Sequence, residues 1–146
     1  MDSPVVSLLV NVDVADLEVA TRFYVQAFGL AVGRRLGDGV VELVGANALI
    51  HLLENPAGTP AAASTRDVRR YDRHWTPVHL DFLVDDLDAA LERALAAGAR
   101  QDTPVRSHDW GRIVLLSDPF GHGLCVIELR GRGYDALADP GPSAQG

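Results

Sequence analysis

The chain has 146 residues, of which 47% are hydrophobic, so it suits one domain with a core of ordinary size. Thirteen basic and twenty acidic residues give a net charge of −7, which repels phosphate backbones and argues against nucleic acid as a partner. A neutral or cationic small molecule suits this field better. The opening residues Met1-Asp2-Ser3-Pro4 lack a basic segment, no apolar run is long enough to span a bilayer, and Cys125 is the single cysteine. These features predict a cytoplasmic protein without disulfides or a membrane partner.

The sequence repeats itself at a spacing of 70 residues. The segment Val14-Ala15-Asp16-Leu17 corresponds to Val84-Asp85-Asp86-Leu87, and the matches continue at alanines further along each copy. Self-similarity of this kind indicates two copies of one structural unit.

Each copy opens with a predicted strand, residues 6–14 in the first and 78–84 in the second, because both are rich in aliphatic and β-branched residues. A helix follows. Its N-cap is Asp16 or Asp86, whose carboxylate can accept the free N–H groups of the first turn. Its end is Gly29 or Gly98, where glycine can adopt the left-handed conformation.

Three further strands complete each copy, separated by turns rich in Gly, Asn and Asp. They are predicted at residues 30–36, 40–44 and 48–53, and at 101–107, 112–116 and 124–129. The order predicts an α+β fold in which two βαβββ modules form curved sheets around a shared cleft. A ferredoxin-like fold or a simple sandwich is the alternative. The modules are residues 1–53 and 76–130 of one compact domain, 54–75 connect them, and 131–146 form a tail expected to be disordered beyond about residue 138.

Both copies carry short motifs at corresponding places. The first copy carries Val14-Ala15-Asp16-Leu17, then Arg22-Phe23-Tyr24 and Phe28-Gly29-Leu30. The second carries a segment from His79 to Leu87 and the turn Asp118-Pro119-Phe120-Gly121-His122. These motifs resemble those of the vicinal oxygen chelate superfamily, which includes glyoxalase I, bleomycin-resistance proteins and extradiol dioxygenases. The resemblance covers residues 5–129 and implies a ligand cleft and a homodimer.

The resemblance also implies four places that can hold a divalent metal, on the first and fourth strands of each module. In this chain they carry Leu9, His51, His79 and Cys125. Two histidines and a cysteine could hold Zn, Fe, Mn or Ni with an open position, although Leu9 cannot ligate. Without a carboxylate, this set lacks both the glyoxalase base and the dioxygenase triad. The alternatives are an inert, buried Cys125 and a hydrogen-bonded core His51, with no metal bound.

Glu128 is a possible substitute carboxylate, but strand alternation places it on the face opposite Cys125, where an exposed role is the alternative. The 70-residue repeat gives Asn11 and Asp81 equivalent places, as a polar pair that binds a ligand or whose members bond to each other or to nearby backbone. His79 and Asp81 could couple as a catalytic base and the group that orients it.

The two tryptophans, Trp75 and Trp110, could form a stacking wall for a flat ligand, or cover the edge of the core. Arg112 could bind a ligand carboxylate, or lie on the surface as an ordinary arginine.

These features favour a small-molecule-binding protein without the full glyoxalase or dioxygenase metal site. The alternative is a metal-dependent lyase, isomerase or dioxygenase acting on a substrate with vicinal oxygens. A scaffold with a vestigial cleft is a third possibility.

Overall fold

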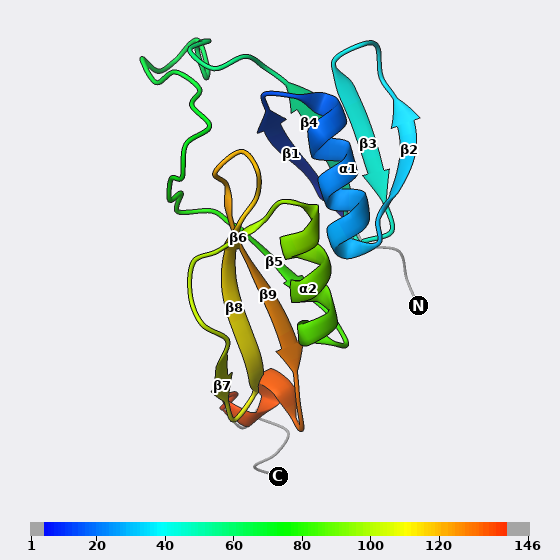
Figure 1. The fold of residues 1–146 in the computed structure, drawn as a ribbon, viewed down its shortest axis with the longest axis vertical. Coiled ribbons are helices and arrows are strands. Elements are labelled where there is room, and N and C mark those ends of the chain that lie inside the picture. Colours follow the sequence, from blue (N-terminus) through cyan, green and yellow to red (C-terminus); the bar gives the residue numbers. More distant parts are fainter. Residues whose placement is uncertain (1–4, 140–146) are drawn as a thin grey trace.

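The computed structural model describes residues 5–139 and has the two βαβββ modules that the repeat predicts (Figure 1). The first module contains β1 (Leu9–Val14), α1 (Leu17–Phe28), β2 (Ala31–Arg35), β3 (Val40–Val44) and β4 (Leu49–Glu54). The second contains β5 (Leu80–Leu83), α2 (Leu87–Ala97), β6 (Arg100–Gln101), β7 (Arg106–His108), β8 (Gly111–Ser117) and β9 (Gly123–Leu129). A short 3-10 helix follows at Gly133–Ala136, within the segment predicted as a tail, whereas residues 140–146 lie outside the described part.

The caps predicted from the sequence are present in both helices. Asp16 and Asp86 each accept the N–H of the residue three positions later, and Gly29 and Gly98 end the helices in the left-handed conformation. The single strand predicted at 101–107 is instead divided into β6 and β7, which pair with different parts of β8. Pro104 stands between the two strands and has no N–H to donate to a ladder.

Each module forms its own sheet. The strand order is β1-β4-β3-β2 in the first and β5-β9-β8-β6 in the second, where β7 pairs with the remaining part of β8. The strands β1 and β5 are therefore the edges of their sheets, and each is parallel to the last strand of its module.

The core lies between the sheets and the two helices, which lie in front of the strands in Figure 1 and pack against one another. Val14, Phe23 and Tyr24 are almost completely buried in it. The ring of Phe28 on α1 stacks on the ring of Phe82 on β5, with centroids 3.9 Å apart. The two modules thus share one core through their helices, which fixes how their sheets are placed.

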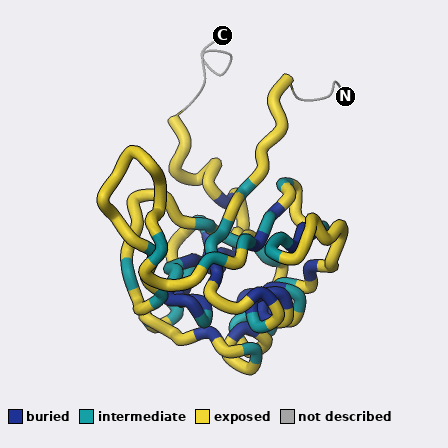
Figure 2. Tube along the Cα trace, turned by 90° about the horizontal axis from the view of Figure 1, so that it is seen from above, coloured by how far each residue is buried: buried dark blue, intermediate teal, exposed yellow. Residues whose placement is uncertain are grey.

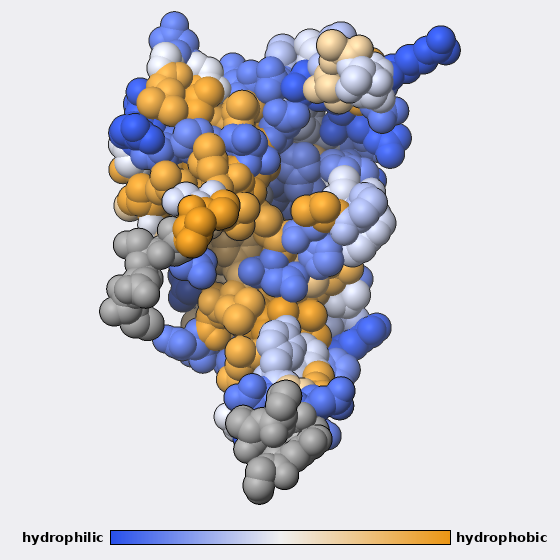
Figure 3. Space-filling view, turned by 180° about the vertical axis from the view of Figure 1, so that it is seen from behind, coloured by the Kyte–Doolittle hydropathy of each residue, from blue (hydrophilic) through white to orange (hydrophobic). Residues whose placement is uncertain are grey.

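No α-helix of residues 5–139 lies over the opposite face of the two sheets. Strand alternation turns Leu9 on β1, Leu49 on β4 and Leu83 on β5 away from the helices, and they are 45%, 39% and 56% exposed. Figure 3 shows apolar side chains gathered on this face, which is called the open face below.

The connector, residues 55–79, is exposed along most of its length, whereas buried positions gather inside the molecule (Figure 2). Polar contacts hold it to both modules. Arg69 forms an ion pair with Asp13 of β1 at 2.8 Å, and His74 forms an isolated β-bridge with His122 before β9. No helix in residues 5–139 is long and apolar enough to cross a membrane.

Candidate functional site

A pocket of about 250 Å³ lies where β1 and β5, the edge strands of the two sheets, face each other. It is called the seam pocket. Its walls are mainly aliphatic, and its polar groups include Asn11, Thr76 and His79. The lining residues come from β1, α1, the connector, the first residue of β5, and the turn and first residues of β9: Val10 to Asp13, Tyr24, His74, Thr76, Val78 to Leu80, and His122 to Leu124. Apolar walls with a few convergent polar groups are typical of small-molecule sites.

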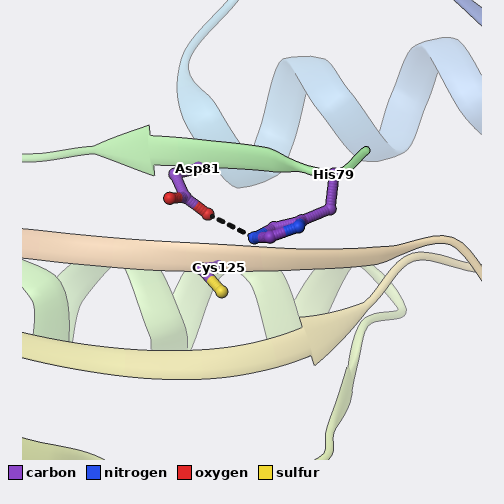
Figure 4. A group of neighbouring side chains, drawn as sticks. All are labelled: His79, Asp81 and Cys125. Carbon is purple, nitrogen blue, oxygen red and sulfur yellow. Dashed lines mark ion pairs between the residues drawn. The ribbon is translucent and has the colours of Figure 1, made fainter. Parts of the chain in front are cut away.

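Three possible metal donors meet beside this pocket, all in the second module. His79 precedes β5, Asp81 lies on β5, and Cys125 is the register partner of Asp81 on β9 (Figure 4). Their nitrogen, oxygen and sulfur atoms all lie within 4.8 Å of one another. The ring of His79 points to the carboxylate of Asp81, with Nε2 and Oδ1 3.2 Å apart. The structure therefore places the predicted base, His79, beside its predicted orienting carboxylate, Asp81, and the Cys125 thiol lies close to both.

Burial and the nearby Asp81 carboxylate raise the pKa of the Cys125 thiol to about 11. Without a cation, the thiol is neutral at ordinary pH, which agrees with the alternative of an inert, buried cysteine. With a cation, the donor set of imidazole, carboxylate and thiolate suits zinc or iron(II). The residues present thus fit a divalent metal, and Asp81 supplies the carboxylate absent from the set predicted by position.

His51, the third residue predicted for a metal, is not part of this group. Its Nε2 lies 2.9 Å from Oε2 of Glu42 on β3, and Arg34 on β2 donates two hydrogen bonds to the same carboxylate. The hydrogen bonds from Arg34 and His51 lower the pKa of the Glu42 carboxyl to about 2, and that from Arg34 has the larger effect. His51 is thus a hydrogen-bonded histidine on the first module. Its partner Glu42 was missed, although alternation in β3 turns it toward the open face.

Asn11 and Asp81 do not bond to each other, which was one of the possibilities for this repeat-equivalent pair. Asn11 lines the seam pocket and is the register neighbour of His51, whereas Asp81 faces His79. No hydrogen bond joins the two within residues 5–139.

The two tryptophans lie at opposite ends of the second sheet. Trp75 is 61% exposed and its ring is 5.0 Å from that of His79, beside the site. Trp110 lies before β8, where its ring stacks on His108 and contacts Tyr134. The structure therefore does not bring the two together as one wall. Only Trp75 is close enough to contact a ligand near His79.

Two charged residues considered for the site belong to the helix face. Arg112 donates two hydrogen bonds of 2.9 Å to Asp88 on α2. Glu128 accepts the N–H of Leu87 at the start of α2, and it is 8% exposed. The exposed role considered for Glu128 is wrong, because the N-terminus of α2 covers it. Its placement opposite Cys125 follows the predicted alternation.

Two further polar contacts at the seam pocket were not predicted from the sequence. His74 and His122 contact each other there, and the hydroxyl of Tyr24 donates to the buried carboxylate of Asp118 at 2.6 Å. His74 lies in the connector, where no periodic pattern indicates its partner.

Comparison with known proteins identifies the class to which this fold and site belong. Residues 9–127 match the sequence profile of the glyoxalase-like domain. The chain is a member of this glyoxalase-like family.

Its relatives include two proteins of Streptomyces named for anthracycline biosynthesis. DauV of Streptomyces sp. (strain C5) is 34% identical over 125 residues, and DnrV of Streptomyces peucetius is 35% identical over 120 residues. The matches cover 85% and 82% of this chain but 41% and 39% of those proteins, so the chain spans about two fifths of their length.

Solved structures confirm the fold. A glyoxalase/bleomycin resistance protein/dioxygenase family enzyme from Burkholderia phytofirmans PsJN has a TM-score of 0.68 and 20% identity, covering 84% of this chain and 97% of that one. The fosfomycin resistance protein FosX from Listeria monocytogenes has a TM-score of 0.63 and 20% identity, covering 90% and 98%.

Proposed function

We propose that this protein binds a small molecule in the seam pocket, with an apolar ring system against the aliphatic walls and an oxygen near Asn11 and His79. The observation that carries this proposal is the pocket itself, where aliphatic walls and a few polar groups converge between two modules. Trp75 lies beside His79 and offers an exposed ring for stacking.

The ligand class follows from charge and from the relatives. A net charge of −7 favours a neutral or cationic ligand over an anion. DauV and DnrV are named for anthracycline biosynthesis, which makes an anthracycline, a fused aromatic ring system bearing several oxygens, the first probe. The pocket, of about 250 Å³, has room for one part of such a molecule, and the remainder would lie outside it.

Titration with an anthracycline, followed by tryptophan fluorescence and calorimetry, tests the proposal. Saturable binding is expected for the protein and for the control His108→Ala, which lies at the far end of the second sheet. Val78→Trp, at an exposed position on the pocket wall, should block entry, and Asn11→Ala should weaken binding about tenfold. Absence of saturable binding across a panel of anthracyclines and other aromatic polyketides would reject the proposal.

A second candidate function is metal-dependent catalysis, favoured by the donors of His79, Asp81 and Cys125. A divalent metal held there would act as a Lewis acid toward an oxygenated substrate. Elemental analysis after purification without added metal should then give about one metal per chain. Cobalt(II) should produce a thiolate absorption band that is lost in Cys125→Ser and retained in His51→Ala. A metal-free protein that shows no such band rejects this candidate.

The proposal includes a homodimer. The open face exposes Leu9 and Leu83, which a second copy would cover. Sedimentation of the purified protein should give twice the chain mass, and Leu83→Lys should give the monomer. A monomeric wild-type protein would contradict this part alone.

A further inference from the structure

His74 in the connector and His122 before β9 meet through their ring nitrogens. Nε2 of His74 lies 3.1 Å from Nδ1 of His122, and the rings are nearly perpendicular. The outer nitrogens both face backbone carbonyls. Nδ1 of His74 lies 2.7 Å from the carbonyl of Asp72, and Nε2 of His122 lies 2.6 Å from the carbonyl of Asp13 on β1.

This geometry requires one proton more than two neutral imidazole rings carry. A carbonyl oxygen only accepts hydrogen bonds, so both outer nitrogens must carry hydrogen. A neutral imidazole carries only one hydrogen, so in two neutral rings both inner nitrogens would present lone pairs to each other across 3.1 Å. One additional proton turns this repulsive contact into a charge-assisted hydrogen bond.

We infer that His74 and His122 share one extra proton, and that this histidine clasp holds the connector against both modules in a pH-dependent way. His74 belongs to the part of the seam pocket wall that the connector supplies. His122 lies in the last turn of the second module, and its ring bonds to β1 of the first module. Loss of the proton would loosen the connector wall of the pocket. The clasp is a property of the protein without ligand, so it does not depend on the proposed function.

The backbone around the clasp keeps the two rings close. The N–H of His74 donates to the carbonyl of Gly121 at 3.2 Å. Gly121 has a φ of +80°, and a Cβ there would lie 2.2 Å from the carbonyl oxygen of Asp72. The connector is therefore packed closely on this turn, and its backbone holds the two rings near each other.

Both carboxylates and arginines surround the clasp. Asp118 is buried, and its Oδ1 accepts the backbone N–H of His122 at 3.0 Å, which places a carboxylate in the same turn. The carboxylate of Asp13 is already paired with Arg69. The other ionisable and charged groups around the clasp are Tyr24 on Asp118, Tyr71 beside His122, His79 in the seam pocket, Arg73 with its partner Asp102, and Asp72 with Arg70.

The stability of the clasp depends on pH through the shared proton. The clasp stabilises the closed connector while one proton is shared, and this contribution is lost as the pH rises and the proton leaves. At lower pH, a second proton would place two imidazolium rings in contact, which is also unfavourable. The closed state is therefore confined to a pH window with two limits.

Nitrogen NMR of the histidine rings and amide hydrogen exchange, on metal-free protein between about pH 5 and about pH 8, test the inference. The two rings should lose one proton in a single shared step. Corrected protection of the His74 amide should fall about tenfold across that step. His74→Gln supplies a neutral N–H donor to His122, so protection should no longer change with pH. The control His108→Gln should behave as the wild type.

Three results would overturn the inference. The rings could titrate independently, each taking its own proton. Protection at residues 72–76 could be independent of pH in the wild-type protein. His74→Gln could retain the full pH dependence.

Discussion

Glu54 and Glu128 perform the same task in the two modules: each carboxylate accepts the N–H of the first residue of its module's helix. Glu54, the last residue of β4, binds the N–H of Leu17 at 2.9 Å, and Glu128 on β9 binds that of Leu87 at 3.0 Å. A negative charge at a helix N-terminus is favourable because the free N–H groups carry partial positive charge. The repeat therefore extends from the first strand of each module to its last, and each helix is fastened to its own sheet at one end.

Removal of the Glu54 carboxylate should destabilise the protein. The variant Glu54→Ala leaves the N–H of Leu17 without its acceptor and should lower the free energy of unfolding by about 1 kcal/mol. Urea denaturation measures the change. Glu92→Ala, an exposed carboxylate on α2, is the control, and equal midpoints for the two variants would contradict the prediction.

The hydrogen bond between Tyr24 and Asp118 should be important for stability. In Tyr24→Phe the buried carboxylate loses its only side-chain donor within the described residues, so the free energy of unfolding should fall by about 1–3 kcal/mol. Tyr134→Phe, at a half-exposed ring, should have no effect. Burial, with the nearby Asp118, raises the pKa of Tyr24 well above its ordinary value. Spectroscopic titration of the folded protein should therefore miss one tyrosine, and ionisation of all three would argue against this environment.

The ion pair of Arg34 and Glu42 should set the acid sensitivity of the first module. Because the pKa of Glu42 is lowered to about 2, its charge stabilises the fold above the ordinary carboxyl pKa, and this contribution is lost as the pH falls toward 2. Arg34→Met removes the main cause of the shift, so this variant should be less stable than the wild type at neutral pH and should lose less stability as the pH falls below the ordinary carboxyl pKa. Unfolding midpoints measured from about pH 3 to about pH 7 check this. Arg35→Met, on the neighbouring position, should follow the wild type; parallel profiles for all three proteins would rule the assignment out.

Cys125 should react slowly with thiol reagents. A pKa of about 11 leaves little thiolate at neutral pH, and the side chain is only 8% exposed. A chromogenic disulfide at about pH 8 should react roughly a hundredfold more slowly than with an unfolded control. Asp81→Asn removes the carboxylate that helps to raise the pKa, so its reaction should be faster. A rate in Asp81→Asn no higher than in the wild type would show that burial alone protects the thiol.

The sequence was sufficient for the features that depend on local rules. The caps at Asp16, Asp86, Gly29 and Gly98 follow from the chemistry of helix ends, and they appear where predicted. The pairing of His79 with Asp81 was also within reach, because alternate residues of one strand share a face.

The contacts between distant segments could not be predicted in this way. Glu42 and His51 meet because β3 and β4 pair in one particular register, and His74 meets His122 because the connector returns to the last turn. Alternation gives the face on which a side chain lies, but not which neighbouring segment comes to cover it. The separation of Trp75 from Trp110 has the same origin, since it depends on the direction of β8 relative to β5.

The stacking of Phe28 on Phe82 has a consequence for the chain as a whole. A polypeptide consisting of one module would leave one of these rings, and the helix face around it, open to water. Such a half would gain stability by associating with another copy of itself through that face, and its folding would then depend on concentration. The connector converts this association into an intramolecular event, so the joined modules remain paired even when the protein is scarce.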